Sequence, residues 1–408
     1  MKPKVLLLGH LPPSAGGITS LLLTILASGT IQDYELIPFN IGRPAKRNVV
    51  HNYGYHALLN SGLKRGIIAV AITLWHLGIF PIVVFWHRPA IIHIHSAPFL
   101  VFWETAYYVF IARILRIPCC LQFHSSLRHF YEMSGPTLRT AIFHVISMAK
   151  AFVVVCREDM GLVAEKAGDN TRCFYLPNFI DVGTFQRSIT RARGQVQPER
   201  NIAILFLGGS DAVHKGLNDL LSVVRLLGRS QLGLHFLLVA VPKEKVEPEL
   251  PADLLPCCSI LDWVSGNAKL EVFAKTDLFV LPSIAEGMPM GILEAMASSI
   301  PVVATKVGGI PDMITDGQEG YQLNPGDVEG LVKAISHLAQ DPDKRKKMGE
   351  KGLQKALSLY DIPIGTQQLE NLYKEILQYP SCKAKPGANP RCFLTRILFL
   401  LCCCSCDF

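Results

Sequence analysis

The stretch LFVLPSIAEGMPMGILEAMASSIPVVA, residues 278–304, decides the fold class of this chain. Its apolar start, Leu278–Leu281, is typical of a buried parallel strand, and a loop rich in glycine and proline comes after it. A helical run then ends near Ser298, and residues 301–304 predict the next strand. A strand, loop, helix and strand in this order form the repeating unit of a doubly wound α/β sheet. The loop therefore lies at the carboxyl end of a strand, where such sheets bind ligands.

This loop and the start of its helix are a candidate site for a phosphate. A helix N-terminus presents free N–H groups and about half a positive charge, which suits an anion. Pro289 has no N–H. The expected amide donors are its neighbours Met288, Met290, Gly291 and Ile292. Glu286 and Glu294 flank the site, and a carboxylate is unfavourable there unless it binds the hydroxyl groups of a sugar or a ribose. The alternative is that Glu286 caps the helix and Glu294 faces solvent.

The same residues resemble a known family. The segment EGMPMGILEAMA, residues 286–297, is similar to the E-x7-E signature of the group 1 retaining glycosyltransferases, which have the GT-B fold of two Rossmann-like domains. The segment PVVATKVGGIPDMI, residues 301–314, is similar to the segment that comes next in that family, and PNFID, residues 177–181, resembles its PNGVD connector. The resemblance implies that Glu294 binds the nucleotide ribose. It also implies that Glu286, Gly287 and the loop amides bind the donor sugar and its diphosphate.

A second loop carries a candidate diphosphate ligand. Residues 202–207 predict a buried strand, and the turn after it contains Gly209, Ser210 and Lys215. A lysine at the mouth of a strand–helix turn suits a diphosphate, because its ammonium is a compact charge on a long stem. The resembling family has this lysine and usually an arginine five positions earlier, where this chain has Ser210. His214, a basic residue of the other domain, or helix N-termini would offset the missing cation. A solvated Lys215 is the alternative.

The amino-terminal half contributes a glycine pair and several histidines. Gly16 and Gly17 come after the first predicted strand and let the backbone approach a ligand closely; the resembling family has such a pair facing the donor diphosphate across a cleft. His124 stands at the end of a strand, where the family often has a histidine that contacts the donor sugar. A hydrogen-bonded structural histidine is the alternative there, and His10 is a second cleft candidate. Core or rim roles are expected for two histidines inside an earlier strand, His93 and His95.

Charge is unevenly distributed along the 408 residues, whose formal net charge is +7. The first 195 residues hold 19 of the 40 Lys and Arg but only 9 of the 33 Asp and Glu. This basic, apolar half suggests a surface that meets anionic lipid or a phosphorylated acceptor, with ordinary solubility charge as the alternative. The basic residues form no recognisable nucleic-acid module. No pair or Cys/His spacing among the 12 cysteines suggests zinc, which favours a reduced cytosolic protein, and no signal peptide is evident.

Two further apolar segments require interpretation. Residues 66–86 contain no Asp, Glu, Lys or Arg, which by length permits a membrane span. A single crossing would separate two strands of one sheet, and His76 and Pro81 are expected to interrupt the segment, so we favour an interfacial helix over a span or a buried core helix. The cysteine-rich tail, residues 380–408, is too short in its apolar part to span, and we interpret it as irregular, with acylation as the alternative.

We therefore predict an α/β protein of the GT-B class. Residues 1–185 form a Rossmann-like acceptor domain, residues 186–200 a linker and residues 201–359 a Rossmann-like donor domain, with helices at about 360–378 packing back on the first domain. The predicted catalytic residues are His124, Lys215 and Glu286.

The predicted reaction is retaining transfer of a sugar from a nucleotide-diphosphate donor to a glycan or lipid-linked acceptor, in envelope or exopolysaccharide synthesis. No paired acids are placed for a metal, and no cofactor is expected. We expect a cytoplasmic protein on the inner face of the membrane, in peripheral contact with anionic lipid, that binds no nucleic acid. The alternatives are a nucleotide-sugar 2-epimerase and a non-catalytic membrane-surface protein with a decayed transferase fold.

Overall fold

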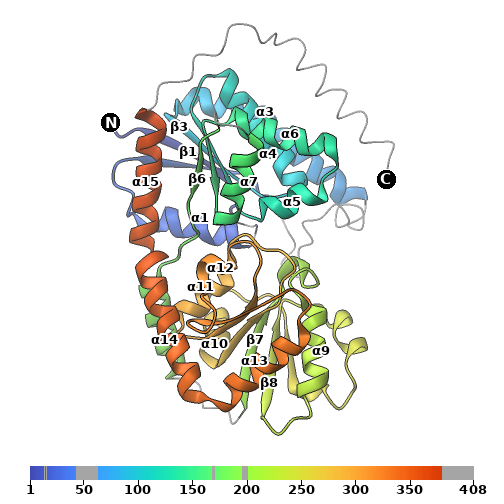
Figure 1. Cartoon of the computed structure of the whole chain (residues 1–408). Coiled ribbons are helices and arrows are strands. Elements are labelled where there is room, and N and C mark those ends of the chain that lie inside the picture. Colours follow the sequence, from blue (N-terminus) through green and yellow to red (C-terminus); the bar gives the residue numbers. More distant parts are fainter. Residues whose placement is uncertain (13, 15, 43–62, 168–170, 195–200, 379–408) are drawn as a thin grey trace.

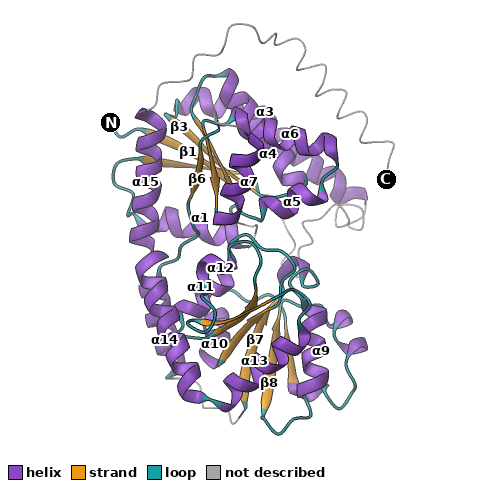
Figure 2. Ribbon diagram, viewed as in Figure 1, coloured by secondary structure: helices purple, strands orange, loops and turns teal. Residues whose placement is uncertain are grey.

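The chain folds into two α/β domains, one above the other in Figures 1 and 2. The structure, a computed structural model, describes residues 1–12, 14, 16–42, 63–167, 171–194 and 201–378. The first domain contains β1 (Lys4–Gly9), α1 (Gly17–Ser28), β2 (Glu35–Asn40), α3 (Leu63–His87), β3 (Ile91–Ser96), α4 (Leu100–Ile114), β4 (Cys119–Phe123), α5 (Leu127–Met133), α6 (Pro136–Met148), β5 (Ala151–Val154), α7 (Arg157–Ala167) and β6 (Cys173–Tyr175). The second contains α8 (Val182–Arg193), β7 (Ile202–Leu207), α9 (Leu217–Leu227), β8 (Leu234–Val239), β9 (Cys258–Leu261), α10 (Gly266–Lys275), β10 (Leu278–Leu281), α11 (Met290–Ala297), β11 (Val302–Thr305), α12 (Ile310–Met313), β12 (Gly320–Leu323), α13 (Val328–Gln340) and α14 (Pro342–Leu359). The last described helix is α15 (Ile362–Gln378).

Each domain is built on a parallel sheet of six strands whose order reverses once. The order is β2-β1-β3-β4-β5-β6 in the first sheet and β12-β11-β10-β7-β8-β9 in the second. In doubly wound sheets, ligands bind outside the carboxyl ends of the strands where the order reverses. That point lies between β1 and β3 in the first sheet and between β7 and β10 in the second. The predicted doubly wound α/β architecture is confirmed, and the predicted donor-binding turns come directly after β1, β7 and β10.

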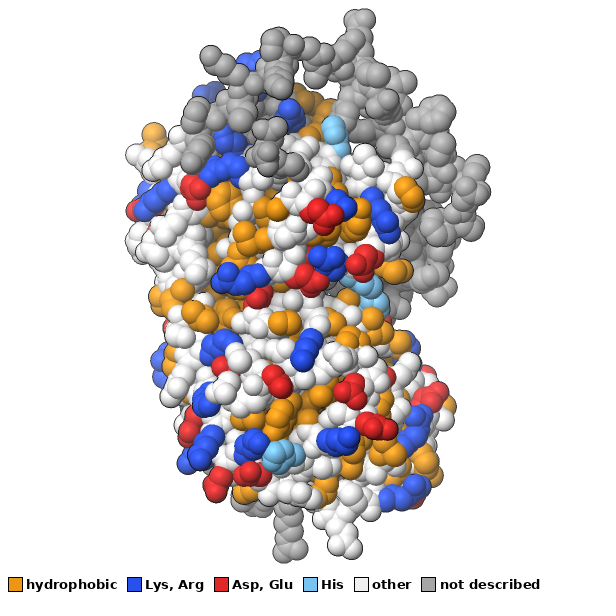
Figure 3. All heavy atoms as spheres, in the orientation of Figure 1, with side chains coloured by type: hydrophobic (Ala, Val, Ile, Leu, Met, Phe, Trp, Pro, Cys, Tyr) orange, Lys and Arg blue, Asp and Glu red, His pale blue; other side chains and the backbone are white. Residues whose placement is uncertain are grey.

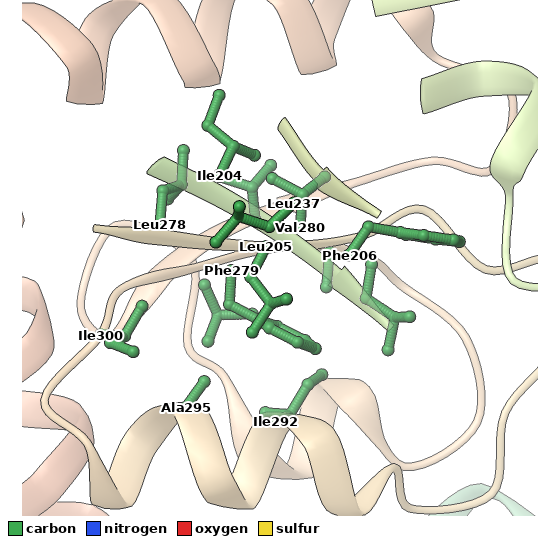
Figure 4. Close-up of a cluster of buried hydrophobic side chains, with 14 of the residues drawn as sticks. Ile204, Leu205, Phe206, Leu237, Leu278, Phe279, Val280, Ile292, Ala295 and Ile300 are labelled. Atoms are coloured by element: carbon green, nitrogen blue, oxygen red, sulfur yellow. The ribbon is translucent and has the colours of Figure 1, made fainter. Parts of the chain in front are cut away.

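The strands are apolar on both faces because helices cover both sides of each sheet. Figure 4 shows this core in the second domain, where side chains of β7 and β10 lie over Ile292 and Ala295 of α11. Gly291 lets α11 approach closely, since a Cβ atom there would lie 3.0 Å from the ring of Phe279. Packing against β10 therefore fixes where the first turn of α11 begins.

The predicted interruption of the apolar segment at residues 66–86 is wrong, because α3 runs through Pro81 without a break. Proline removes the hydrogen bond to the carbonyl four residues earlier. That carbonyl belongs to Leu77, and here it accepts a hydrogen bond from the hydroxyl of Tyr107 on α4, at 2.9 Å. Phe80 and Val84 are buried in the core of the first domain, so one face of α3 packs on the domain.

The chain crosses between the domains twice. Residues 186–193, expected to belong to an irregular linker, are helical, because α8 runs from Val182 to Arg193 and packs against α10, α11 and α14. Its start is capped by Asp181, whose carboxylate accepts from the Thr184 amide at 2.8 Å. After α14, the chain returns through α15, which packs on α1 of the first domain. Figure 1 shows α14 and α15 along one side of the molecule. The rest of the expected linker (195–200), residues 43–62 and the cysteine-rich tail lie outside the described residues.

Candidate functional site

The loops after β7 and β10 interlock at the point where the strand order of the second sheet reverses. Gly216 has φ +85°, and a Cβ atom there would lie 2.0 Å from the carbonyl oxygen of Pro282. Only glycine fits this contact. The Ile284 amide also donates to the carbonyl of His214 at 2.9 Å. Because the two backbones touch, Lys215 is brought beside the loop that carries Glu286.

The predicted partners Lys215 and Glu286 lie together. The Lys215 Nζ atom is 3.9 Å from Glu286 Oε1, and the hydroxyl of Ser283 donates to the same oxygen at 3.0 Å. Glu286 does not cap α11, whose N-cap position is Pro289 without a side-chain hydrogen bond. The two loops thus bring one cation and one carboxylate together, next to a helix start whose N-cap residue supplies no side-chain hydrogen bond.

Glu294 is buried, so the alternative of a solvent-facing carboxylate is wrong. Its side chain is only 7% exposed, and Oε1 forms an ion pair with Lys269 of α10. The second oxygen, Oε2, is buried and has no hydrogen-bond partner among the described residues. A buried carboxylate oxygen without a donor is costly, which makes Oε2 a candidate acceptor for the hydroxyl group of a ligand. The sequence interpretation missed Lys269, since nothing local in α10 indicates its partner.

The start of α11 faces the glycine turn of the first domain. A Cβ atom on Gly17 would lie 3.2 Å from Cγ of Met290, whereas one on Gly16 would meet nothing within 4 Å. A Cβ atom on Gly287 would lie 2.6 Å from the carbonyl oxygen of His124. The predicted residues of the two domains are therefore in contact, with Gly16 at an open position beside them.

The predicted loop amides are not equivalent. The Ile292 amide donates to the carbonyl of Pro289 at 3.1 Å, and the Ile292 side chain is in the core. Met288 is also buried: its carbonyl accepts from the Asn178 side-chain amide at 2.8 Å, and its Sδ atom accepts from the Asn178 backbone amide at 3.0 Å. Met290, in contrast, lies against Gly17 of the first domain, while Gly291 packs on Phe279 of its own domain.

Asn178 fixes the proton positions on His124. Because its side-chain nitrogen donates to Met288, its oxygen faces His124 Nδ1, at 3.2 Å. An amide oxygen only accepts, so Nδ1 carries the proton and Nε2 accepts from His95 Nδ1, at 2.7 Å. The chain of contacts continues to His93, whose ring is tilted by 31° against that of His95 with centroids 4.3 Å apart. The Nδ1 atom of His93 pairs with the hydroxyl of Tyr373, at 2.8 Å. Both ring nitrogens of His124 thus have protein partners, and its predicted bond to a donor sugar requires one of them to be displaced.

Burial keeps these histidines neutral. Together with the nearby His124, it lowers the pKa of His93 to about 3, against an opposing hydrogen bond with Gln122. Burial likewise lowers the pKa of His124 to about 4, against the opposing effect of the hydrogen bond that its Nδ1 donates to Asn178. The pKa of His95 also falls well below its ordinary value because of burial and its two histidine neighbours. The sequence contained a signal for this histidine cluster, because His93 and His95 are two positions apart on one strand and their side chains therefore lie on the same face of the sheet.

The remaining predicted residues lie at the edges of this arrangement. Gly209 and Ser210 belong to the short 3₁₀ turn Gly209–Asp211, and a Cβ atom on Gly209 would lie 3.9 Å from Trp263. His214 reaches the first domain, where its Nε2 atom is 3.2 Å from Nε2 of His129. Figure 3 shows acidic and basic side chains interspersed over both domains on the face drawn there. Among the residues that the structure describes, no group of three or more His, Cys, Asp or Glu is placed to hold a metal ion.

Comparison with known proteins shows which family the second domain resembles. The model of the family "Glycosyl transferases group 1" matches residues 201–341, which contain both interlocked loops, α10 and α11. A sulfoquinovosyl transferase of Arabidopsis thaliana is 28% identical over 70% of this chain and 56% of its own length. The chain spans about half the length of the curated relatives it matches.

Solved structures share the whole fold. Sucrose-phosphate synthase from Thermosynechococcus elongatus superposes with a TM-score of 0.69 and 15% identity, over 92% of this chain and 99% of that one. HepE from Anabaena, in complex with UDP and glucose, gives a TM-score of 0.66 and 16% identity, over 91% and 100%. At these identities the likeness to solved structures shows only the fold, and the relation to a family rests on the match to the family model. Residues 201–341 thus match the group 1 glycosyltransferase family, and the two domains together have the GT-B fold.

Proposed function

We propose that the protein is a retaining glycosyltransferase that uses a nucleotide-diphosphate sugar as donor. The observation that carries this proposal is the approach of Gly17 to Met290, which sets the glycine turn of one domain against the first turn of α11 in the other. A diphosphate between them would meet backbone amides of a helix start and the ammonium of Lys215. The structure of HepE with UDP and glucose supports a donor of this class.

Glu294 and its partner explain why a carboxylate stands beside an anion site. Lys269 balances the charge of Glu294, and the free Oε2 atom is available to a ribose hydroxyl. Glu286 is positioned by Ser283 and is proposed to contact the donor sugar. When the sugar–phosphate bond breaks, negative charge grows on the diphosphate, and prearranged amides and Lys215 stabilise it; losing one such donor typically costs about 3–4 kcal/mol of barrier.

The acceptor we propose is a membrane-bound or lipid-linked glycan, used at the inner face of the cytoplasmic membrane in envelope or exopolysaccharide synthesis. Its support is the basic, acid-poor character of the first domain, which in this fold faces the donor across the cleft. The Arabidopsis relative is named a sulfoquinovosyl transferase, which supports sugar transfer as the reaction class.

The test is donor binding and transfer by the wild type and by Glu294→Ala. Loss of hydrogen bonds to a charged group predicts an affinity for the nucleotide sugar about 10- to 100-fold lower, measured by calorimetry across a panel of nucleotide sugars. Glu329→Ala is the control, because Glu329 is an exposed glutamate on α13 of the same domain. Undiminished binding by Glu294→Ala would refute the ribose assignment.

Two outcomes would replace the proposal altogether. Conversion of a UDP-sugar into its 2-epimer without any acceptor would make the protein an epimerase. Absence of nucleotide-sugar binding across the whole panel would favour a non-catalytic role. Transfer to a soluble acceptor as fast as to a lipid-linked one would contradict only the proposed acceptor class.

A further inference from the structure

Helix α3 presents an apolar face to solvent, opposite the face that packs on the first domain. Phe80 and Val84 are buried in the core, and because they are four positions apart, their side chains lie on the same side of the helix. On the other side, six large apolar side chains are between 55% and 81% exposed: Val70, Leu74, Trp75, Ile82, Phe85 and Trp86. At 100° per residue these six fall within less than half a turn of the helix. We call this set the α3 face.

The α3 face differs from the isolated exposed apolar side chains of an ordinary protein surface. Single exposed apolar residues are normal on a soluble protein, but a contiguous stripe marks a surface that binds something. Two of its six members are tryptophans, the residue enriched where a membrane meets water. Among described helices, α3 alone is long and apolar enough to cross a membrane by length and composition. Its buried side is committed to the domain core, which favours lying on a membrane over crossing it.

Basic residues flank the α3 face and acidic ones are missing from it. The end of α3 carries Arg88, exposed and stacked on Phe85 with its guanidinium carbon 5.9 Å from the ring centroid. The end of the adjacent α4 carries Arg113 and Arg116, both exposed. Two exposed apolar residues, Ile114 and Leu115, lie between them. Both helix ends lead into the neighbouring strands β3 and β4, so they lie at the same edge of the sheet.

The charge pattern therefore fits an anionic partner. Between residues 63 and 131 the only acidic residue is Glu104, and it is buried. An apolar stripe with basic residues beside it is the pattern of interfacial helices that bind anionic lipid, because apolar burial and attraction to headgroups act together.

We propose that the α3 face docks in the plane of a bilayer that carries anionic headgroups, with Arg88, Arg113 and Arg116 contacting those headgroups. The helix lies along the membrane surface, its aromatic side chains enter the headgroup boundary, and the first domain remains outside the hydrocarbon. This surface lies on the outside of the first domain and is distinct from the cleft at Gly17 and His124. The inference requires no particular sugar donor and goes beyond the proposed reaction.

Co-sedimentation of the full-length chain with vesicles tests the proposal without donor or acceptor, so its result is independent of the transferase activity. Vesicles of phosphatidylcholine alone are compared with vesicles that also contain phosphatidylglycerol. Trp75→Glu combined with Phe85→Glu is expected to lower the bound fraction at least about tenfold, since each buries a charge in the interface. Leu226→Glu is the matched control, because Leu226 is 61% exposed on α9 in the other domain.

A second variant guards against misfolding, since it changes only exposed charges. Arg113→Glu with Arg116→Glu is expected to abolish the preference for phosphatidylglycerol, and added salt should weaken binding of the wild type in the same direction. Binding that ignores phosphatidylglycerol, or that survives both double variants, would overturn the proposal. Concentration-dependent dimers that Trp75→Glu and Phe85→Glu abolish, without vesicle binding, would instead assign the face to a second copy of the chain.

Discussion

The two domains have sheets of the same size and direction, yet they build their parts of the cleft in different ways. In the second domain, neighbouring loops touch through their backbones, as Gly216 does against Pro282. In the first domain, His95, His124 and Asn178 come from separate segments and meet only through their side chains. Backbone contacts need glycine at fixed positions, whereas side-chain contacts need only the right partner somewhere in the fold. The cleft loops of the second domain are therefore recognisable as a motif, and the cleft residues of the first domain are not.

The largest effect is expected at the buried ion pair of the second domain. Lys269→Met leaves the carboxylate of Glu294 buried and unpaired, and breaking a buried pair in this way costs about 3–5 kcal/mol. We expect the second domain of this variant to unfold at a clearly lower denaturant concentration, measured by circular dichroism.

The control for this prediction restores neutrality. Lys269→Met combined with Glu294→Gln removes both charges, and we expect it to recover most of the lost stability while donor binding stays weak. If the single variant is as stable as the wild type, the pair contributes nothing to the fold, and the free Oε2 atom loses its interpretation as a ligand site.

Acid is expected to destabilise the first domain selectively. His93 and His95 are buried and their pKa values lie well below 6.5, so the unfolded chain takes up protons first as the pH falls. Stability is thus full above pH 6.5 and decreases as the pH falls below it. For His93 the loss is about 2 kcal/mol at pH 5 and is complete near pH 3, and His95 adds a loss in the same direction.

Hydrogen exchange can measure the stability of each domain separately in this experiment. Amides of β3 and β4 should lose protection between pH 7 and pH 5, after correction for the intrinsic exchange rate, while those of β7 and β10 serve as the internal reference. His93→Gln should remove about one histidine's share of the loss. Equal losses of protection in both sheets would contradict the prediction.

A smaller effect is expected where the two halves meet. In Gly287→Ala the new Cβ atom would lie 2.6 Å from the carbonyl oxygen of His124, so the domains must separate to accommodate it. We expect kcat to fall about tenfold, because the closed cleft is what excludes water and aligns the groups, while the affinity for the donor changes little. Gly161→Ala is the control, as a Cβ atom there meets nothing within 4 Å. An unchanged kcat would show that the reaction does not require this contact.

The difference between the halves also explains how much could be predicted from the sequence. Alternating apolar strands and helices predicted both sheets, and the resemblance of residues 286–297 to a family signature indicated the loop that lies beside Lys215 in the structure. The helix at α8 was missed because arginine, glutamine and threonine conceal its periodic apolar positions, Val182 and Ile189. The partners Lys269 of Glu294 and Asn178 of His124 were missed as well. Each lies more than 20 positions from its partner, and no local pattern records such a pairing.

The smallest effect is expected at the rim of the cleft, at the pair formed by Arg157 and Asp312. The side chain of Arg157 is 70% exposed and its Nε atom is 3.8 Å from Asp312, so water screens the attraction and the pair contributes at most about 1 kcal/mol. The guanidinium carbon of Arg157 also lies 4.5 Å from the centroid of the Tyr175 ring. The backbone amide of Arg157 donates to the Asp312 carboxylate at 2.9 Å, and a substitution of the Arg157 side chain leaves this hydrogen bond in place. Arg157→Ala should therefore change stability by less than about 1 kcal/mol, measured by urea unfolding. Asp312→Ala should cost more, because it also removes the acceptor of that amide. If the two variants cost the same, the side-chain charge rather than the backbone hydrogen bond joins the domains here.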